Sequence, residues 1–186
     1  MQPVRYDGWY SYQELTDTLQ AWAAEAPRLL EVESLGRSYE GREIWLATVT
    51  NLDTGSAAEK PGFLVEANIH AIEVTGCTAA LHLIHRLLTG HGSDSKVTRA
   101  LDTRAFYVIP RLNPDGSELA LAERPRFLRS SVRPWPLADP QDGLHEEDVD
   151  GDGRVLYMRV PDPNGAWRVA EEDPRLLVAR GPLETE

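Results

Sequence analysis

Residues 63–76 read FLVEANIHAIEVTG, and this stretch decides how the chain is understood. Its first part, residues 63–69, is a short and mostly apolar run, which is typical of a central strand covered on both faces. Residues 74–88 repeat apolar side chains at helical spacing, so we predict a helix there. His70 and Glu73 therefore lie where a buried strand gives way to a helix, and ligand crevices of α/β folds form at such places.

The surrounding sequence predicts further helices and strands in an alternating order. Apolar periodicity and turn residues place a helix, two strands, a second short helix and another buried strand at residues 11–24, 29–35, 44–50, 95–101 and 105–109. This order predicts an α/β protein with a mixed sheet. After residue 124 the pattern dissolves into Pro, Asp, Gly and Arg, so we divide the chain into residues 1–125 and a loop-rich segment, 126–186.

Composition excludes several classes of function. The 186 residues carry a formal net charge of −11, and such an acidic chain repels nucleic acid. The single cysteine, Cys77, cannot form a disulfide within the chain. No apolar run is long enough to predict a membrane span, and the first residues do not resemble a signal peptide. We therefore expect a soluble, cytoplasmic protein with no nucleic-acid or membrane partner.

The spacing of His70 and Glu73 suits a metal ion. Zinc is held by imidazole nitrogen and carboxylate oxygen, and catalytic zinc sites use three protein ligands and a water molecule. A His and a Glu three residues apart across a tight turn can converge on one ion, where the bound water becomes a nucleophile at neutral pH. A His-x-x-Glu pair also occurs by chance, so the spacing alone leaves the metal site open.

Three segments together are more specific than this pair. Residues 36–44 read GRSYEGREI, residues 65–76 read VEANIHAIEVTG, and residues 109–116 read IPRLNPDG. In this order they resemble the motifs of the M14 zinc carboxypeptidases, the carboxypeptidase A-like family, and the resemblance extends over residues 6–133. It implies a mixed-sheet zinc-peptidase fold of the phosphorylase/hydrolase-like type. It also implies a metallocarboxypeptidase that acts on the C-terminus of a peptide or protein.

The resemblance assigns roles to individual residues. His70 and Glu73 match the first two zinc ligands of the family. Arg129 matches the arginine that polarises the scissile carbonyl, and a fixed guanidinium can stabilise the oxyanion that forms there. Residues 113–116, Asn-Pro-Asp-Gly, are expected to form a type I turn beside the site, and we interpret them as structural.

Several parts of the family site have no match in this sequence. The family needs a third zinc ligand, an Asn-Arg pair for the substrate carboxylate, a Tyr and a catalytic Glu. His145 is the only histidine after residue 91, and its neighbours do not resemble the context of the third ligand. We therefore expect a truncated domain that is incomplete on its C-terminal side. It should have an uncovered apolar sheet edge, and this chain alone should show little activity.

An acidic loop follows at residues 148–154, which read DVDGDGR. Asp148, Asp150 and Asp152 match the D-x-D-x-D-G start of a calcium loop, in which alternating carboxylates surround one hard cation. The twelfth position is Arg159 instead of the bidentate glutamate of such loops. The sequence is therefore compatible with calcium, and also with a tight turn whose charges are solvated.

Two other functions stay open at this point. The first is a zinc amidohydrolase of the succinylglutamate desuccinylase and aspartoacylase type, which shares the His-x-x-Glu pair. The Glu-Gly-Arg turn and the Asn-Pro-Asp-Gly segment favour the carboxypeptidase over it. The second is a binding module that keeps the fold without the chemistry.

Overall fold

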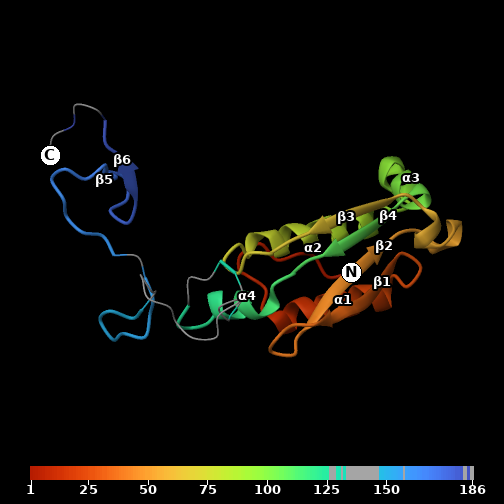
Figure 1. Cartoon of the computed structure of the whole chain (residues 1–186). Coiled ribbons are helices and arrows are strands. Elements are labelled where there is room, and N and C mark those ends of the chain that lie inside the picture. The colour runs from red at the N-terminus through yellow and green to blue at the C-terminus, as the bar shows by residue number, and fades with distance from the viewer. Residues whose placement is uncertain (126–128, 131, 133–146, 157, 182–183, 185–186) are drawn as a thin grey trace. The chain divides into compact units, whose positions relative to one another are not determined.

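The computed structural model describes residues 1–125, 129–130, 132, 147–156, 158–181 and 184. The chain forms two compact units, Met1–Val155 and Leu156–Glu186 (Figure 1). In the described residues no helix is long and apolar enough to cross a bilayer.

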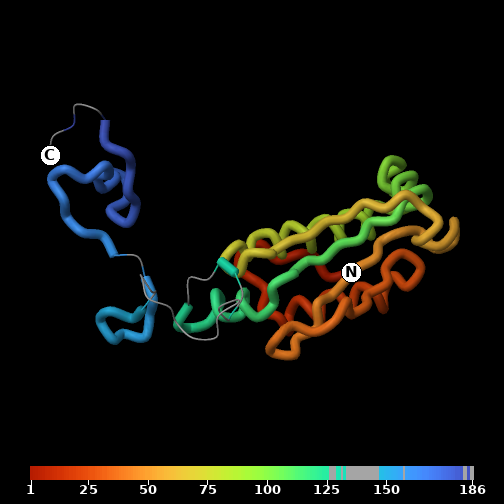
Figure 2. The backbone as a smooth tube through the Cα atoms, viewed as in Figure 1, coloured from red at the N-terminus to blue at the C-terminus, as the bar shows by residue number. Residues whose placement is uncertain are grey.

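A four-stranded mixed sheet organises the first unit (Figures 1 and 2). Its strands are β1 (Leu30–Arg37), β2 (Glu43–Val49), β3 (Gly62–Glu66) and β4 (Ala105–Ile109), in the order β1-β2-β4-β3. The pairs β1–β2 and β2–β4 are antiparallel, whereas β3 runs parallel to β4. The predicted α/β class and its mixed sheet are therefore confirmed.

Four helices and two short 3-10 turns complete this unit. They are α1 (Tyr12–Glu25), η1 (Leu52–Thr54), η2 (Ala57–Glu59), α2 (Thr75–Gly90), α3 (Ser95–Thr103) and α4 (Pro114–Ala120). Helix α1 begins at a capping box, since the Glu14 N–H donates to the Ser11 hydroxyl and the Ser11 N–H donates to the Glu14 carboxylate. The helices predicted at residues 11–24, 74–88 and 95–101 are all present, with ends shifted by a few residues.

The hydrophobic core lies between the sheet and two of these helices. Helices α1 and α2 pack side by side, with the rings of Trp22 and His85 5.4 Å apart. One cluster of buried side chains joins them to the strands and to α3, and its fully buried members include Leu19, Trp22, Leu81, Ile84, Leu101 and Val108. This core supports β3 and the start of α2, the two elements that flank His70 and Glu73.

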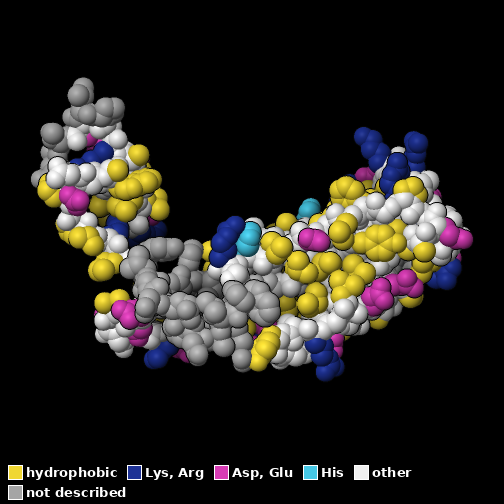
Figure 3. Space-filling view, in the orientation of Figure 1, with side chains coloured by type: hydrophobic (Ala, Val, Ile, Leu, Met, Phe, Trp, Pro, Cys, Tyr) yellow, Lys and Arg dark blue, Asp and Glu magenta, His cyan; other side chains and the backbone are white. Residues whose placement is uncertain are grey.

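The prediction that residues 63–69 form a central strand covered on both faces is wrong for the described sheet. Strand β3 is an edge strand, because it pairs with β4 alone, and Phe63 and Leu64 are 57% and 58% exposed. Figure 3 shows hydrophobic side chains gathered along one face of the first unit. An apolar run predicts that its side chains can be buried. It does not predict how many strands pair with it, because the pairing strands come from distant parts of the chain.

The expectation of an isolated turn at residues 113–116 is also corrected. These residues form the first turn of α4, with Asn113 as N-cap and Pro114 in the first helical turn. The Asn113 side chain accepts a hydrogen bond of 3.0 Å from the Gly116 N–H. Asn at the N-cap and Pro directly after it are the residues that helix starts prefer, so the same letters suit a turn and a helix entry.

The second unit contains little regular structure, as the sequence predicts for this part of the chain. Its two short strands, β5 (Trp167–Val169) and β6 (Leu177–Ala179), form an antiparallel pair. The Arg180 guanidinium donates to the carbonyl of Pro163 at 2.7 Å, which ties the segment before β5 to the end of β6.

Candidate metal centre

His70 and Glu73 meet at the carboxyl end of β3. The Nδ1 atom of His70 lies 2.8 Å from Oε2 of Glu73, and the two side chains are 33% and 54% exposed. Their donor atoms thus converge at the protein surface, where an ion from solvent can reach them. Two ligands of a tetrahedral zinc ion at about 2 Å lie roughly 3.3 Å apart, so a small opening of this pair would accommodate the metal.

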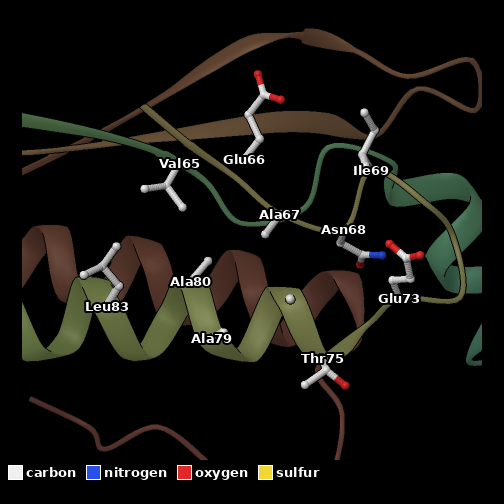
Figure 4. Close-up of a pocket in the computed structure, with 11 residues that line it drawn as sticks. Val65, Glu66, Ala67, Asn68, Ile69, Glu73, Thr75, Ala79, Ala80 and Leu83 are labelled. Atoms are coloured by element: carbon white, nitrogen blue, oxygen red, sulfur yellow. The ribbon is translucent and has the colours of Figure 1, made fainter. Parts of the chain in front are cut away.

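The backbone between β3 and α2 brings these side chains together. Asn68 has a positive φ of 54°, and in the described residues no other non-glycine residue has one. The chain turns there, and the Glu73 N–H then donates to the His70 carbonyl at 3.2 Å in a tight turn. Figure 4 shows this loop between β3 and the first turn of α2, with Asn68 inside it and Glu73 at its far side.

A surface depression of about 410 Å³ joins the candidate ligand to the other motif segments. Its wall includes Ser38 and Tyr39, His70, Asn113 and Arg129. Residues from the Glu-Gly-Arg turn, the His-x-x-Glu turn and the Asn-Pro-Asp-Gly helix start thus border one depression, although they are far apart in sequence. A second depression, of about 610 Å³, lies between β3 and α2 and has Glu73 at one end (Figure 4).

Arg129 lies beside the candidate ligand pair. Its Nη1 atom is 3.4 Å from Oε1 of Glu73, and its side chain is 66% exposed, so the ion pair itself contributes little stability. The backbone around it is held more firmly. The Ala71 N–H donates to the Arg129 carbonyl at 3.1 Å, and the Asn113 amide donates to the Ser130 carbonyl at 2.8 Å.

Asp115 connects the turn after β1 to the start of α4. Its carboxylate accepts hydrogen bonds from the Ser38 hydroxyl at 2.7 Å, the Glu40 N–H at 3.0 Å and the Arg42 guanidinium at 2.7 Å. Burial by itself would raise the pKa of Asp115, but the Glu40 N–H, Arg42 and Ser38 together outweigh it and lower the pKa below its ordinary value. The ionised form of Asp115 therefore fastens one wall of the depression.

In the part of the chain that the structure describes, no third His, Cys, Asp or Glu completes a group of three with His70 and Glu73. His145 lies outside the described residues. The one group of three such side chains found there is Asp148, Asp150 and Asp152, whose carboxylate oxygens lie within 4.8 Å of one another.

This acidic loop has an ordered backbone. The N–H groups of Gly151 and Gly153 each donate to the Asp148 carboxylate at 2.7 Å, and these bonds lower the pKa of Asp148. All three carboxylates are exposed, and exposed acidic groups often gather without an ion.

Sequence patterns give Asn68 no role and treat Gly116 only as part of a turn, although both lie against the turn that carries His70. A β-carbon added to Gly116 would come within 2.6 Å of the Ala71 β-carbon, so α4 can approach the turn only with glycine at this position. The available signal for Asn68 is its residue type, because Asn tolerates positive φ better than most residues.

Comparison with known proteins identifies relatives of the first unit. The family model described as zinc carboxypeptidase, Peptidase_M14, matches residues 15–137. A zinc carboxypeptidase of Saccharothrix mutabilis subsp. capreolus is 28% identical over 133 residues, which are 72% of this chain and 29% of that protein. A Saccharomyces cerevisiae protein named an inactive metallocarboxypeptidase is 34% identical over 115 residues, which are 60% of this chain and 27% of that protein.

A solved structure extends the similarity to the fold. The carboxypeptidase A of Helicoverpa armigera superimposes with a TM-score of 0.56 at 26% sequence identity, over 66% of this chain and 30% of that chain. The present chain therefore spans less than a third of the length of each of these three proteins.

Proposed function

Because this chain belongs to the M14 family of zinc carboxypeptidases, we propose that it supplies part of a metallopeptidase site in which His70 and Glu73 hold zinc. The observation that carries the proposal is the 2.8 Å approach of His70 Nδ1 to Glu73 Oε2 at the end of β3. The pair offers one imidazole nitrogen and one carboxylate oxygen, and this donor set fits zinc. The substrate would be the C-terminus of a peptide or protein.

Zinc, when bound, supplies a Lewis acid and activates water for attack on a carbonyl. The residues of this chain would position that chemistry. His70 and Glu73 fix the ion at the end of β3, and the nearby Arg129 offers a positive charge to an oxygen that becomes negative during hydrolysis. Arg129 lies 3.4 Å from Glu73 and lines the same depression as His70, so its charge is beside the proposed zinc ligands.

Zinc binding by the purified chain tests this proposal. Calorimetry at neutral pH is expected to show one zinc ion per chain, with binding lost in His70→Ala and strongly weakened in Glu73→Gln. His82→Ala is the matched control, because it removes a histidine of α2 whose Nδ1 atom lies 2.5 Å from the Tyr6 hydroxyl instead. Equal zinc binding by the unmodified chain and His70→Ala would refute the assignment.

Activity separates the peptidase from a non-catalytic module. The relative named an inactive metallocarboxypeptidase supports a non-catalytic module as the alternative function. We expect this chain by itself to hydrolyse a blocked dipeptide slowly or not at all, because two protein ligands are one fewer than catalytic zinc sites use. Hydrolysis that both a zinc chelator and His70→Ala abolish would show that the site is more complete than we propose.

We also propose that the acidic loop binds calcium. The support is the approach of the Asp148, Asp150 and Asp152 oxygens to within 4.8 Å of one another. Calcium titration is expected to show weak binding, with a Kd of about 0.1–1 mM, because the bidentate glutamate of calcium loops is replaced by Arg159. Asp150→Asn should weaken it and Asp162→Asn should not. An unchanged calcium isotherm in Asp150→Asn would argue for a solvated turn.

A further inference from the structure

Asn68, which lies between β3 and the candidate ligands, has an unusual environment. Asn68 is 4% exposed, and its backbone adopts the left-handed conformation at φ 54°. This conformation is unfavourable for most side chains and is less so for Asn. A polar side chain at a buried, conformationally restricted position must have its hydrogen bonds satisfied by the protein.

The side chain of Asn68 is bonded on both ends of its amide group. Its nitrogen donates to the carbonyl of His70 at 2.8 Å and to the carbonyl of Ala71 at 3.3 Å. Its oxygen accepts from the Ser117 hydroxyl at 2.8 Å, and that hydroxyl shares its one proton with the Asn113 carbonyl at 2.7 Å. The amide thus links the backbone of the His70 turn directly to α4.

The backbone of Asn68 has a second connection to the same helix start. Its carbonyl accepts a hydrogen bond of 3.1 Å from the Asn113 N–H. Asn68 is therefore fixed from two sides by the segment that begins α4, while its own amide holds the loop that carries the candidate ligands. Among the described residues, the hydrogen bonds of the Asn68 side chain go to backbone carbonyls of the turn and to Ser117, so its effect on a metal is expected to act through the backbone of the turn.

We propose that Asn68 is a positioning residue for the metal site, and this inference rests on the proposed function of His70 and Glu73. Asn68 sets where the backbone of the turn lies, and Ser117 sets the orientation of the Asn68 amide. The imidazole and the carboxylate are thereby held close together before an ion arrives. Groups that orient metal ligands from outside the coordination sphere typically change metal affinity tenfold to a hundredfold when removed.

Two substitutions of Asn68 separate its roles. Asn68→Gly keeps the left-handed backbone accessible and removes the amide, whereas Asn68→Asp keeps the size and the acceptor for Ser117 but loses the donor to the two carbonyls. Zinc affinity, measured by calorimetry, is expected to fall about tenfold in each. Ser117→Ala, which leaves Asn68 in place, is expected to cause a smaller fall in the same direction and serves as the second test if the Asn68 variants do not fold.

Asn51→Asp is the matched control for a general loss of stability. Asn51 is also a buried asparagine, at 8% exposure, and its amide donates to Asp102 at 2.7 Å. Asn51 follows the end of β2, which pairs with the start of β4, whereas His70 follows the end of β3, which pairs with the end of β4. Asn51 therefore lies at the opposite end of the sheet from His70. Asn51→Asp should lower the thermal midpoint and leave zinc affinity unchanged. Asn68 variants that also lower only the thermal midpoint would overturn the proposal.

A metal-free measurement distinguishes this proposal from the assignment of zinc itself. The ¹⁵N shifts of the His70 ring at constant pH report the contact of Nδ1 with Glu73. They are expected to change in Asn68→Gly and to stay as in the unmodified chain in Asn51→Asp. If the unmodified chain bound no zinc, the proposed function would fail, and the ring shifts would still decide the role of Asn68: unchanged shifts in Asn68→Gly would refute it.

Discussion

Asp115→Ala is expected to lower the free energy of unfolding by about 3 kcal/mol, because it leaves Arg42 without its buried partner. The side chain of Asp115 is 5% exposed and that of Arg42 is 27% exposed, so the pair is largely removed from water. The substitution also leaves the Ser38 hydroxyl and the Glu40 N–H without their acceptor. Urea denaturation followed by tryptophan fluorescence measures the loss.

An exposed ion pair provides the control for this prediction. Arg37 and Glu43 form a salt bridge of 2.7 Å in the same region, but the Arg37 side chain is 71% exposed. Arg37→Ala should therefore cost no more than about 1 kcal/mol. If Asp115→Ala and Arg37→Ala had equally small effects, the buried network would not fasten the turn after β1 to α4.

The same carboxylate makes stability depend on pH. The pKa of Asp115 is lowered in the folded protein, so its contribution is present above the unfolded-state pKa of about 4 and is lost as pH falls through the folded-state pKa. The unmodified chain should therefore lose more stability than Asp115→Asn when pH is lowered from 5 toward 2. A parallel loss in the two proteins would contradict this linkage.

Gly116→Ala is expected to lower the free energy of unfolding by about 2 kcal/mol, although alanine is the better helix former. The added β-carbon would lie 2.6 Å from the Ala71 β-carbon and 2.9 Å from the Asn113 side chain. Helix α4 and the His70 turn would have to separate to relieve this overlap. We therefore expect weaker zinc binding together with the loss of stability, measured by calorimetry and urea denaturation.

Gly8→Ala is the control for the added methyl group. A β-carbon at Gly8 meets only the Arg5 side chain, at 3.7 Å, which is an ordinary contact. This variant should be as stable as the unmodified chain within about 0.5 kcal/mol. A Gly116→Ala protein with unchanged stability and zinc affinity would show that α4 and the turn can move apart freely.

Local sequence patterns predict the elements that depend on near neighbours. Helix α1 follows from its capping box and its apolar face, and β4 occupies the predicted residues 105–109. The approach of His70 to Glu73 is local as well, because a separation of three residues across a tight turn brings two side chains to one place. The family resemblance of three short segments is likewise readable from the sequence, and the comparison with known proteins confirms it.

Contacts between distant residues decide the rest. The apolar run predicts a strand at β3, but its pairing with β4 alone makes it an edge strand in the described sheet. The link from Asp115 to Ser38 and the bond from Asn68 to Ser117 in α4 join segments that are far apart in the chain. The residue types of the turn at His70 and Glu73 can be read from the sequence. How that turn is held depends on packing, because Asn113 and Ser117, which bond to Asn68, come from a distant segment.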